Sequence, residues 1–170
     1  MVYKIRVILD NEQNVFRDIE LRENQTLWNL HNGIKSAFSL KGDEISVFNL
    51  VNEEGEVLKT IPLEDMSDDG DGETMSDIYL SEVFAKKGDM GHYQYGFIEL
   101  WEMFCELIEI KKELKSVKYP ITSFRFGKVP LKAPSKTNIS TVEMESFDDF
   151  DDDFDDDFSA GFENIDDLDI

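Results

Sequence analysis

Residues 26–40, TLWNLHNGIKSAFSL, form the stretch around which the rest of the chain is organised. Its apolar residues recur at spacings of three and four, which places them on one face of a helix; they are Leu27, Leu30, Ile34 and Phe38. Thr26, or Gln25 before it, stands where an N-cap belongs, and Gly42 follows as a stop signal. A helix this apolar must lie on a sheet, so we expect strands on either side of it.

Alternating apolar and polar residues predict those strands. They cover residues 2–9 and 15–21 before the helix, and 45–51 and 56–61 after it. Polar turns separate the two members of each pair. The order strand, strand, helix, strand, strand is how β-grasp, ubiquitin-like folds begin. The sequence therefore predicts an α+β fold with a β-grasp-like mixed sheet and packed helices.

The second half of the chain is less regular. Residues 64–77 form a polar loop, residues 78–84 predict a short helix, and residues 92–97 predict a strand. The pattern in residues 100–114 fits a helix and a strand equally well. Residues 115–134 contain three prolines, so we expect an irregular but packed segment there.

Charge divides the chain into parts. Of the net charge of −21, residues 143–170 carry −14, because they contain 14 acidic residues and no Lys or Arg. We therefore expect a folded domain at 1–134, a linker at 135–142 and a disordered acidic tail at 143–170. A chain this acidic disfavours nucleic acid as a direct ligand and disfavours anionic membranes, since both need clustered Lys and Arg.

Several chemistries find no support in the sequence. Cys105 is the single cysteine, so it can form no intramolecular disulfide, and we expect it to be buried and structural. We find no signal peptide, membrane span, glycine-rich phosphate loop or nucleophile motif, and expect a cytoplasmic protein without catalytic residues, cofactor or metal.

Two further candidates for chemistry have simpler explanations. His31 and His92 have no partner at a recognisable spacing, so we expect structural histidines, although the two rings could meet in space. Residues 65–76 follow the calcium-loop pattern up to its ninth position, but Ser76 stands where the pattern needs a glutamate. A solvated acidic loop is therefore the expectation for that segment.

Two stretches carry a family resemblance. The helix contains the motif T-L-x-x-L-H-x-x-I, formed by Thr26, Leu27, Leu30, His31 and Ile34. A later aromatic frame consists of Tyr93, Tyr95, Phe97 and Trp101. With the opening strand, these features resemble the Ri-plasmid ORF-three-like family, also labelled passenger TnpR-like proteins of insertion elements.

The resemblance covers about residues 3–134 and implies further structure. In the family the segment after the aromatic frame is a strand, which favours a strand at residues 100–110 paired with residues 92–97. The aspartate, the glycine and the second aspartate of the family's Y-x-Y-D-F-G-D-x-W stretch are replaced here by Gly96, Ile98 and Glu99. The family is functionally uncharacterised, and its TnpR-like label implies a genomic neighbourhood.

Regularly spaced phenylalanines distinguish the acidic tail. They are three or four residues apart, at Phe147, Phe150, Phe154, Phe158 and Phe162. Dense like charge alone predicts a disordered, solubilising segment. Five exposed rings would be costly in such a segment, and as a helix they would form one apolar stripe beside an anionic face. The rings therefore indicate that the tail binds a basic, grooved partner.

Two hypotheses for function follow. The first is a non-enzymatic interaction module whose tail binds a basic partner protein, or binds its own domain through the lysines and arginines between residues 111 and 136. The second is an accessory protein or enzyme in nucleic-acid processing, as the mobile-element label suggests. The lost polar residues of the aromatic stretch favour the first.

Overall fold

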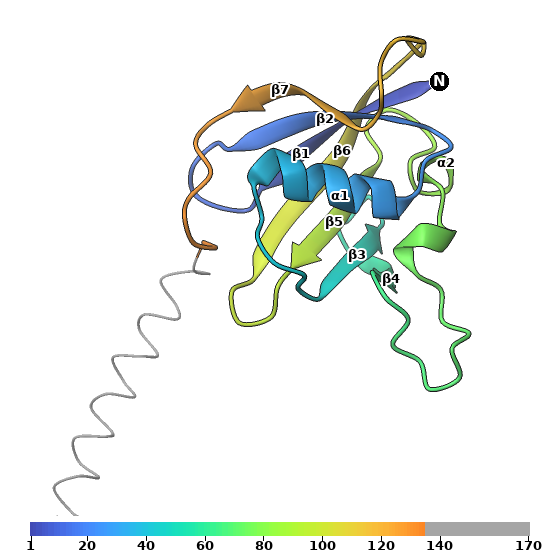
Figure 1. Cartoon of the computed structure of the whole chain (residues 1–170), viewed down its shortest axis with the longest axis vertical. Coiled ribbons are helices and arrows are strands. Elements are labelled where there is room, and N and C mark those ends of the chain that lie inside the picture. The colour runs from blue at the N-terminus through green and yellow to red at the C-terminus, as the bar shows by residue number, and fades with distance from the viewer. Residues whose placement is uncertain (135–170) are drawn as a thin grey trace, which may run out of the picture. The chain divides into compact units, whose positions relative to one another are not determined.

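The computed structural model describes residues 1–134, which contain one seven-stranded sheet with a helix lying across it (Figure 1). The strands are β1 (Val2–Leu9), β2 (Phe16–Arg22), β3 (Ser46–Val51), β4 (Val57–Pro62), β5 (Met90–Tyr95), β6 (Trp101–Lys111) and β7 (Ile121–Phe126). The helices are α1 (Leu27–Phe38), the 3₁₀ turn η1 (Met75–Asp77) and α2 (Leu80–Val83). The predicted α+β class is confirmed.

The sheet has the order β4-β3-β5-β6-β1-β2-β7, and every pairing within it is antiparallel. The expected mixed sheet is therefore wrong for this part of the chain, and a β-grasp-like arrangement is not confirmed. Strand β1 lies between β2 and β6, so the first hairpin joins strands from the second half of the chain. Periodicity within a strand does not say which distant strand will pair with it.

Helix α1 begins at Leu27 and covers one face of the sheet, as its apolar stripe predicts. Thr26 occupies the N-cap, and its backbone N–H donates to the side-chain oxygen of Asn29 at 2.9 Å. The helix ends earlier than Gly42, because Ser39 takes the left-handed conformation, with a φ of 54°.

The hydrophobic core lies between α1 and the sheet. Its largest fully buried side chains include Phe38, Phe48, Phe84 and Tyr93. Cys105 is fully buried in the same core, as expected, and burial raises the pKa of its thiol. The opposite side of β1 and β2 carries ion pairs, such as Arg6 with Asp18 at 2.8 Å.

Each of the segments 100–114 and 115–134 contains a strand. Residues 101–111 form β6, which pairs with β5, so the strand favoured by the family resemblance is confirmed. The expectation of an irregular segment at 115–134 is wrong in part, because β7 forms within it and pairs with β2. Strand β7 is an edge strand with half-exposed Phe124 and Phe126, so it lacks the buried alternation by which strands are recognised.

Within residues 1–134, no helix has the length and apolar character needed to span a membrane.

Candidate functional site

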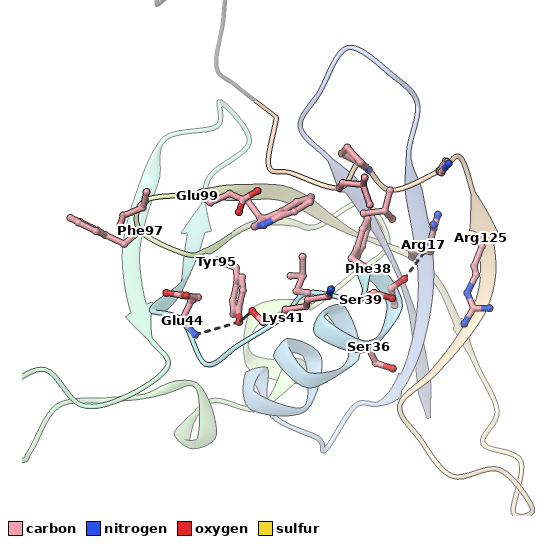
Figure 2. A pocket seen from close by; sticks show the side chains of 18 residues that line it. Arg17, Ser36, Phe38, Ser39, Lys41, Glu44, Tyr95, Phe97, Glu99 and Arg125 are labelled. Carbon is pink, nitrogen blue, oxygen red and sulfur yellow. Dashed lines mark hydrogen bonds between the residues drawn. The ribbon is translucent and has the colours of Figure 1, made fainter.

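A pocket with a cavity volume of about 970 Å³ opens beside the C-terminal end of α1 (Figure 2). Three parts of the chain line it. They are residues 36–44 at the end of α1 and in the following loop, residues 95–101 between β5 and β6, and residues 125–131 at and after the end of β7. Arg17 of β2 completes the lining.

Arg17 is 7% exposed and holds several carbonyl groups together. Its guanidinium donates to the backbone oxygens of Ala37 at 3.3 Å, Phe16 at 2.8 Å, Phe126 at 2.9 Å and Gly127 at 3.0 Å. No carboxylate of residues 1–134 lies within ion-pair distance of it. Neutral dipoles therefore hold a buried positive charge whose field is not cancelled by a neighbouring anion.

Three further cations line the same pocket as Arg17. They are Arg125, Lys128 and Lys41, and all three are exposed. Burial lowers the pKa of Arg17, and the nearby charge of Arg125 lowers it further. Against these four cations the lining contains two carboxylates, Glu44 and Glu99. The pocket is thus locally basic on a domain that is acidic overall.

Tyr95 fixes one wall of the pocket. Its hydroxyl lies 2.8 Å from the carbonyl oxygen of Lys41 and 2.6 Å from that of Gly42, and it accepts the N–H of Glu44 at 3.3 Å. Lys35 donates to the same Gly42 oxygen at 2.6 Å. These contacts hold the loop between α1 and β3 in place, and Figure 2 shows the one between Glu44 and Tyr95.

The segment after β7 is fastened at both ends. Phe126 and Gly127 are held by Arg17, and the N–H of Ala133 donates to the carboxylate of Glu99 at 2.6 Å. Gly127 has a φ of +81°, and a Cβ there would clash with the carbonyl of Asn14. This segment therefore forms a fixed wall of the pocket. Glu99, one of the two carboxylates of the lining, already accepts a hydrogen bond from this segment.

Apolar side chains accompany the charges. Phe38 and Trp101 are buried at the floor, whereas Phe97, Ile98 and Leu131 are 79%, 97% and 98% exposed. Exposed large apolar residues grouped at a cavity are typical of a surface that receives a partner. The eighteen lining residues include no His, Cys or Asp. The arrangement suits the binding of an anionic ligand that also carries apolar groups.

The predicted family-motif residues separate into two groups. Tyr95, Phe97 and Trp101 line the pocket, with Phe97 beyond the end of β5. The helix motif instead builds the cap and core, through Thr26, Leu27, Leu30 and Ile34. The five tail phenylalanines, Phe147, Phe150, Phe154, Phe158 and Phe162, lie outside the described residues.

His31 and Tyr93 form a buried pair beside the pocket. The Nδ1 atom of His31 lies 2.7 Å from the hydroxyl of Tyr93. Burial, and then the charge of Lys35, lowers the pKa of His31 from 6.5 to about 4. His31 is therefore neutral at pH 7 and satisfied by a core tyrosine.

The two histidines lie on opposite faces of the sheet. Tyr93 reaches His31 on α1, and successive side chains of a strand point to opposite faces, so His92 points away from the helix. There its Nδ1 is 3.2 Å from the amide nitrogen of Asn49, and its Nε2 is 3.8 Å from Glu102. They do not form a common site.

The acidic loop at residues 65–76 bonds to itself. The carboxylate of Asp65 accepts the N–H of Ser67 at 2.9 Å, its hydroxyl at 2.7 Å and the N–H of Gly72 at 3.2 Å. These hydrogen bonds lower the pKa of Asp65, those from Ser67 most strongly. The hydrogen bonds account for the shape of this loop.

Sequence reasoning missed Arg17 and Lys41 and included Arg125 and Lys128 only as part of a basic run. A signal for Arg17 was present. In β2 the residues two apart share a face, so Arg17 falls on the buried face with Ile19 and Leu21. A cation at a position where the pattern requires an apolar residue indicates either an ion pair or a site.

Comparisons with known proteins agree with the fold. A family described as "Plasmid pRiA4b ORF-3-like protein" matches residues 1–130, which confirms the predicted resemblance. The crystal structure of a protein of unknown function, MM3350 from Methanosarcina mazei Go1, superposes with a TM-score of 0.64 at 23% identity, covering 79% of this chain and 72% of that one. That likeness shows a shared fold. No curated protein matches the chain.

Proposed function

The chain belongs to the plasmid pRiA4b ORF-3-like family, and we propose that it acts as a non-enzymatic protein-interaction module. In this proposal the acidic, phenylalanine-bearing segment 143–170 binds a basic surface on a partner protein or on its own domain. A cytoplasmic location is part of the proposal, because the single cysteine is a buried free thiol.

The observation that carries the proposal is the composition of the pocket beside α1. Arg17, Arg125 and Lys128 supply positive charge next to the exposed apolar side chains of Phe97 and Ile98. Segment 143–170 has the complementary composition, with 14 acidic residues and five phenylalanines from Phe147 to Phe162. Charge complementarity steers association and selects partners, while buried aromatic anchors supply most of the affinity.

Capture from native lysate tests the proposal. Full-length chain and a chain ending at Val142 are immobilised side by side, at low and at high salt. We expect a partner that is retained by the full chain alone and released by salt, since exposed charge pairs are screened. Equal capture by the two chains would overturn the role of the tail.

A second candidate function is an accessory role in nucleic-acid processing. The basic pocket favours it, because the exposed Arg125 and Lys128 could donate hydrogen bonds to a phosphate group as readily as to a carboxylate. Titration of a labelled oligonucleotide with the full chain distinguishes the two. Oligonucleotide binding by the wild-type chain that is lost in an Arg125→Glu, Lys128→Glu variant would support this second function. If the wild-type chain does not bind the oligonucleotide, the interaction module is the function that remains.

A further inference from the structure

We infer that the acidic segment of the same chain, residues 143–170, occupies the pocket beside α1 and thereby competes with outside partners. The inference rests on the proposed function. It adds the surface to which the segment binds, which is the pocket beside α1. The occupant is the chain's own segment, joined to the wall of the pocket by the chain itself.

Charge is the first argument. The lining carries four cations and two carboxylates, and Glu99 already accepts the N–H of Ala133. Residues 1–142 carry a net charge of −7, with 24 acidic and 17 basic residues, so a basic surface is an exception on this domain. Segment 143–170 has no basic residue that would be repelled there. An anionic chain is attracted to this place and repelled by most of the remaining surface.

Apolar surface is the second argument. Phe97, Ile98 and Leu131 are almost fully exposed at the rim, and such surface gains free energy when it is covered. The phenylalanines of the segment repeat every three or four residues. Two rings separated by one helical turn are about 5–6 Å apart, which suits a cluster of exposed apolar side chains.

Connection is the third argument. Residues 128–131 form a wall of the pocket, and the described chain ends at Pro134. Phe147 follows Pro134 by 13 residues, which span at most about 45 Å when extended. A ligand joined by so short a connection competes at a high effective concentration, in the millimolar range for short connections, so weak individual contacts suffice.

Methyl NMR of the isotope-labelled full-length chain tests the inference. The δ1 methyl of Ile98 and the methyls of Leu131 stand at the rim, where a docked phenyl ring would shift their signals upfield. We compare wild type with a variant in which Phe147, Phe150, Phe154, Phe158 and Phe162 are replaced by Ser. Docking predicts upfield signals in wild type that return to the ordinary range in the variant.

A second set of variants removes the receptor rather than the ligand. Arg125→Glu with Lys128→Glu reverses two charges of the pocket, and we expect it to abolish the upfield shifts. The control is Lys86→Glu with Lys87→Glu, which makes the same change of net charge at exposed residues outside the pocket. The control should keep the shifts. Loss of the shifts in both double variants would mean that net charge alone is responsible and would overturn the inference.

Association between two copies is the competing explanation. Upfield shifts that persist unchanged on hundredfold dilution support docking within one chain, whereas shifts that vanish on dilution would overturn it in favour of a second copy. Unchanged methyl signals throughout, with salt-sensitive partner capture that still needs residues 143–170, would refute the inference and leave the proposed function intact. Absence of both the upfield shifts and the capture that needs residues 143–170 would refute both the inference and the proposed function.

Discussion

At the scale of single residues, Arg17 connects three parts of the pocket. Its guanidinium binds the carbonyls of Ala37 in α1, Phe126 in β7 and Gly127 beyond it. A fork of five N–H donors can serve several acceptors at once, whereas the ammonium group of lysine has three donors on a single atom. The geometry therefore requires arginine and not merely a positive charge.

We predict that Arg17→Lys lowers the free energy of unfolding by about 2–4 kcal/mol, because buried carbonyls lose their donors. Urea denaturation measures the change. The matched control is Arg125→Lys, an exposed arginine of the same pocket, for which we expect a change within about 0.5 kcal/mol. Equal losses in the two variants would contradict the assigned role of Arg17.

His31 makes stability depend on pH. In the folded chain its pKa is about 4, against 6.5 without burial. Between these values the unfolded chain binds a proton that the folded chain refuses, so stability falls as the pH drops from 6.5 towards 4. Above 6.5 neither state is protonated, and the full stability is present.

We expect this group to remove on the order of 3 kcal/mol across that interval, from about 1.4 kcal/mol per pKa unit. Urea denaturation at several pH values compares wild type with His31→Gln, whose amide can still bond Tyr93 but does not titrate. The stability of the variant should fall less steeply between pH 7 and pH 4. Parallel curves would show that His31 is protonated equally in both states.

At the scale of elements, periodicity predicted most of the local structure. The apolar stripe from Leu27 to Phe38 and the approximate positions of the first four strands depend on neighbours in the sequence, and the structure confirms both. Burial alternates along β1, but not along β4, whose first four residues are exposed. The order of strands depends on contacts between distant segments, such as β1 with β6, and no local pattern contains that information. For that reason the prediction of a mixed sheet was wrong.

The pocket was predictable only in part. Tyr95, Phe97 and Trp101 entered through their family resemblance, and the structure places all three in its lining. Arg17 comes from β2, and the nearest lining residue after it is Ser36, so only the packing of α1 on the sheet brings it to the site. Sequence spacing could not show that three loops converge there.

Close packing of α1 on β2 depends on Gly33. A Cβ at this position would lie 3.1 Å from a methyl group of Ile19 and 3.5 Å from Pro120. We predict that Gly33→Leu pushes the helix away from the sheet and destabilises the chain by about 1–3 kcal/mol. Thermal unfolding measures this effect. Asn32→Leu, a partly exposed position on the same helix, should change the midpoint far less, and an equal change would refute steric wedging.

At the scale of the whole molecule, residues 1–134 contain all the material for one core. The buried core cluster runs from Tyr3 to Leu107, with Val129 and Ala133 packed against it. About two thirds of the net charge lies elsewhere, in residues 143–170. The residues that build the core and the residues that carry most of the net charge thus lie in different parts of the sequence. A chain that ends at Val142 should therefore fold cooperatively by itself.

The sign of a salt effect then tests how the two parts interact. If residues 143–170 stayed away from the pocket, their −14 charge would repel a body of −7, and removing them would leave stability unchanged or raise it at low salt. Docking into the basic pocket stabilises only the folded state and predicts the opposite. We expect the full chain to melt above the chain ending at Val142 at 10 mM salt, where the Debye length is about 30 Å.

At 1 M salt, where the Debye length is about 3 Å, the charge contribution should vanish and the two midpoints should converge. Scanning calorimetry of both chains at the two salt concentrations gives four melting midpoints. The sign of the difference between the two chains at low salt distinguishes docking from repulsion. The charge-reversed variant Arg125→Glu with Lys128→Glu should lose the low-salt advantage of the full chain, whereas Lys86→Glu with Lys87→Glu should keep it. A truncated chain that melts higher at low salt would show that repulsion dominates and that the basic pocket serves a ligand other than residues 143–170.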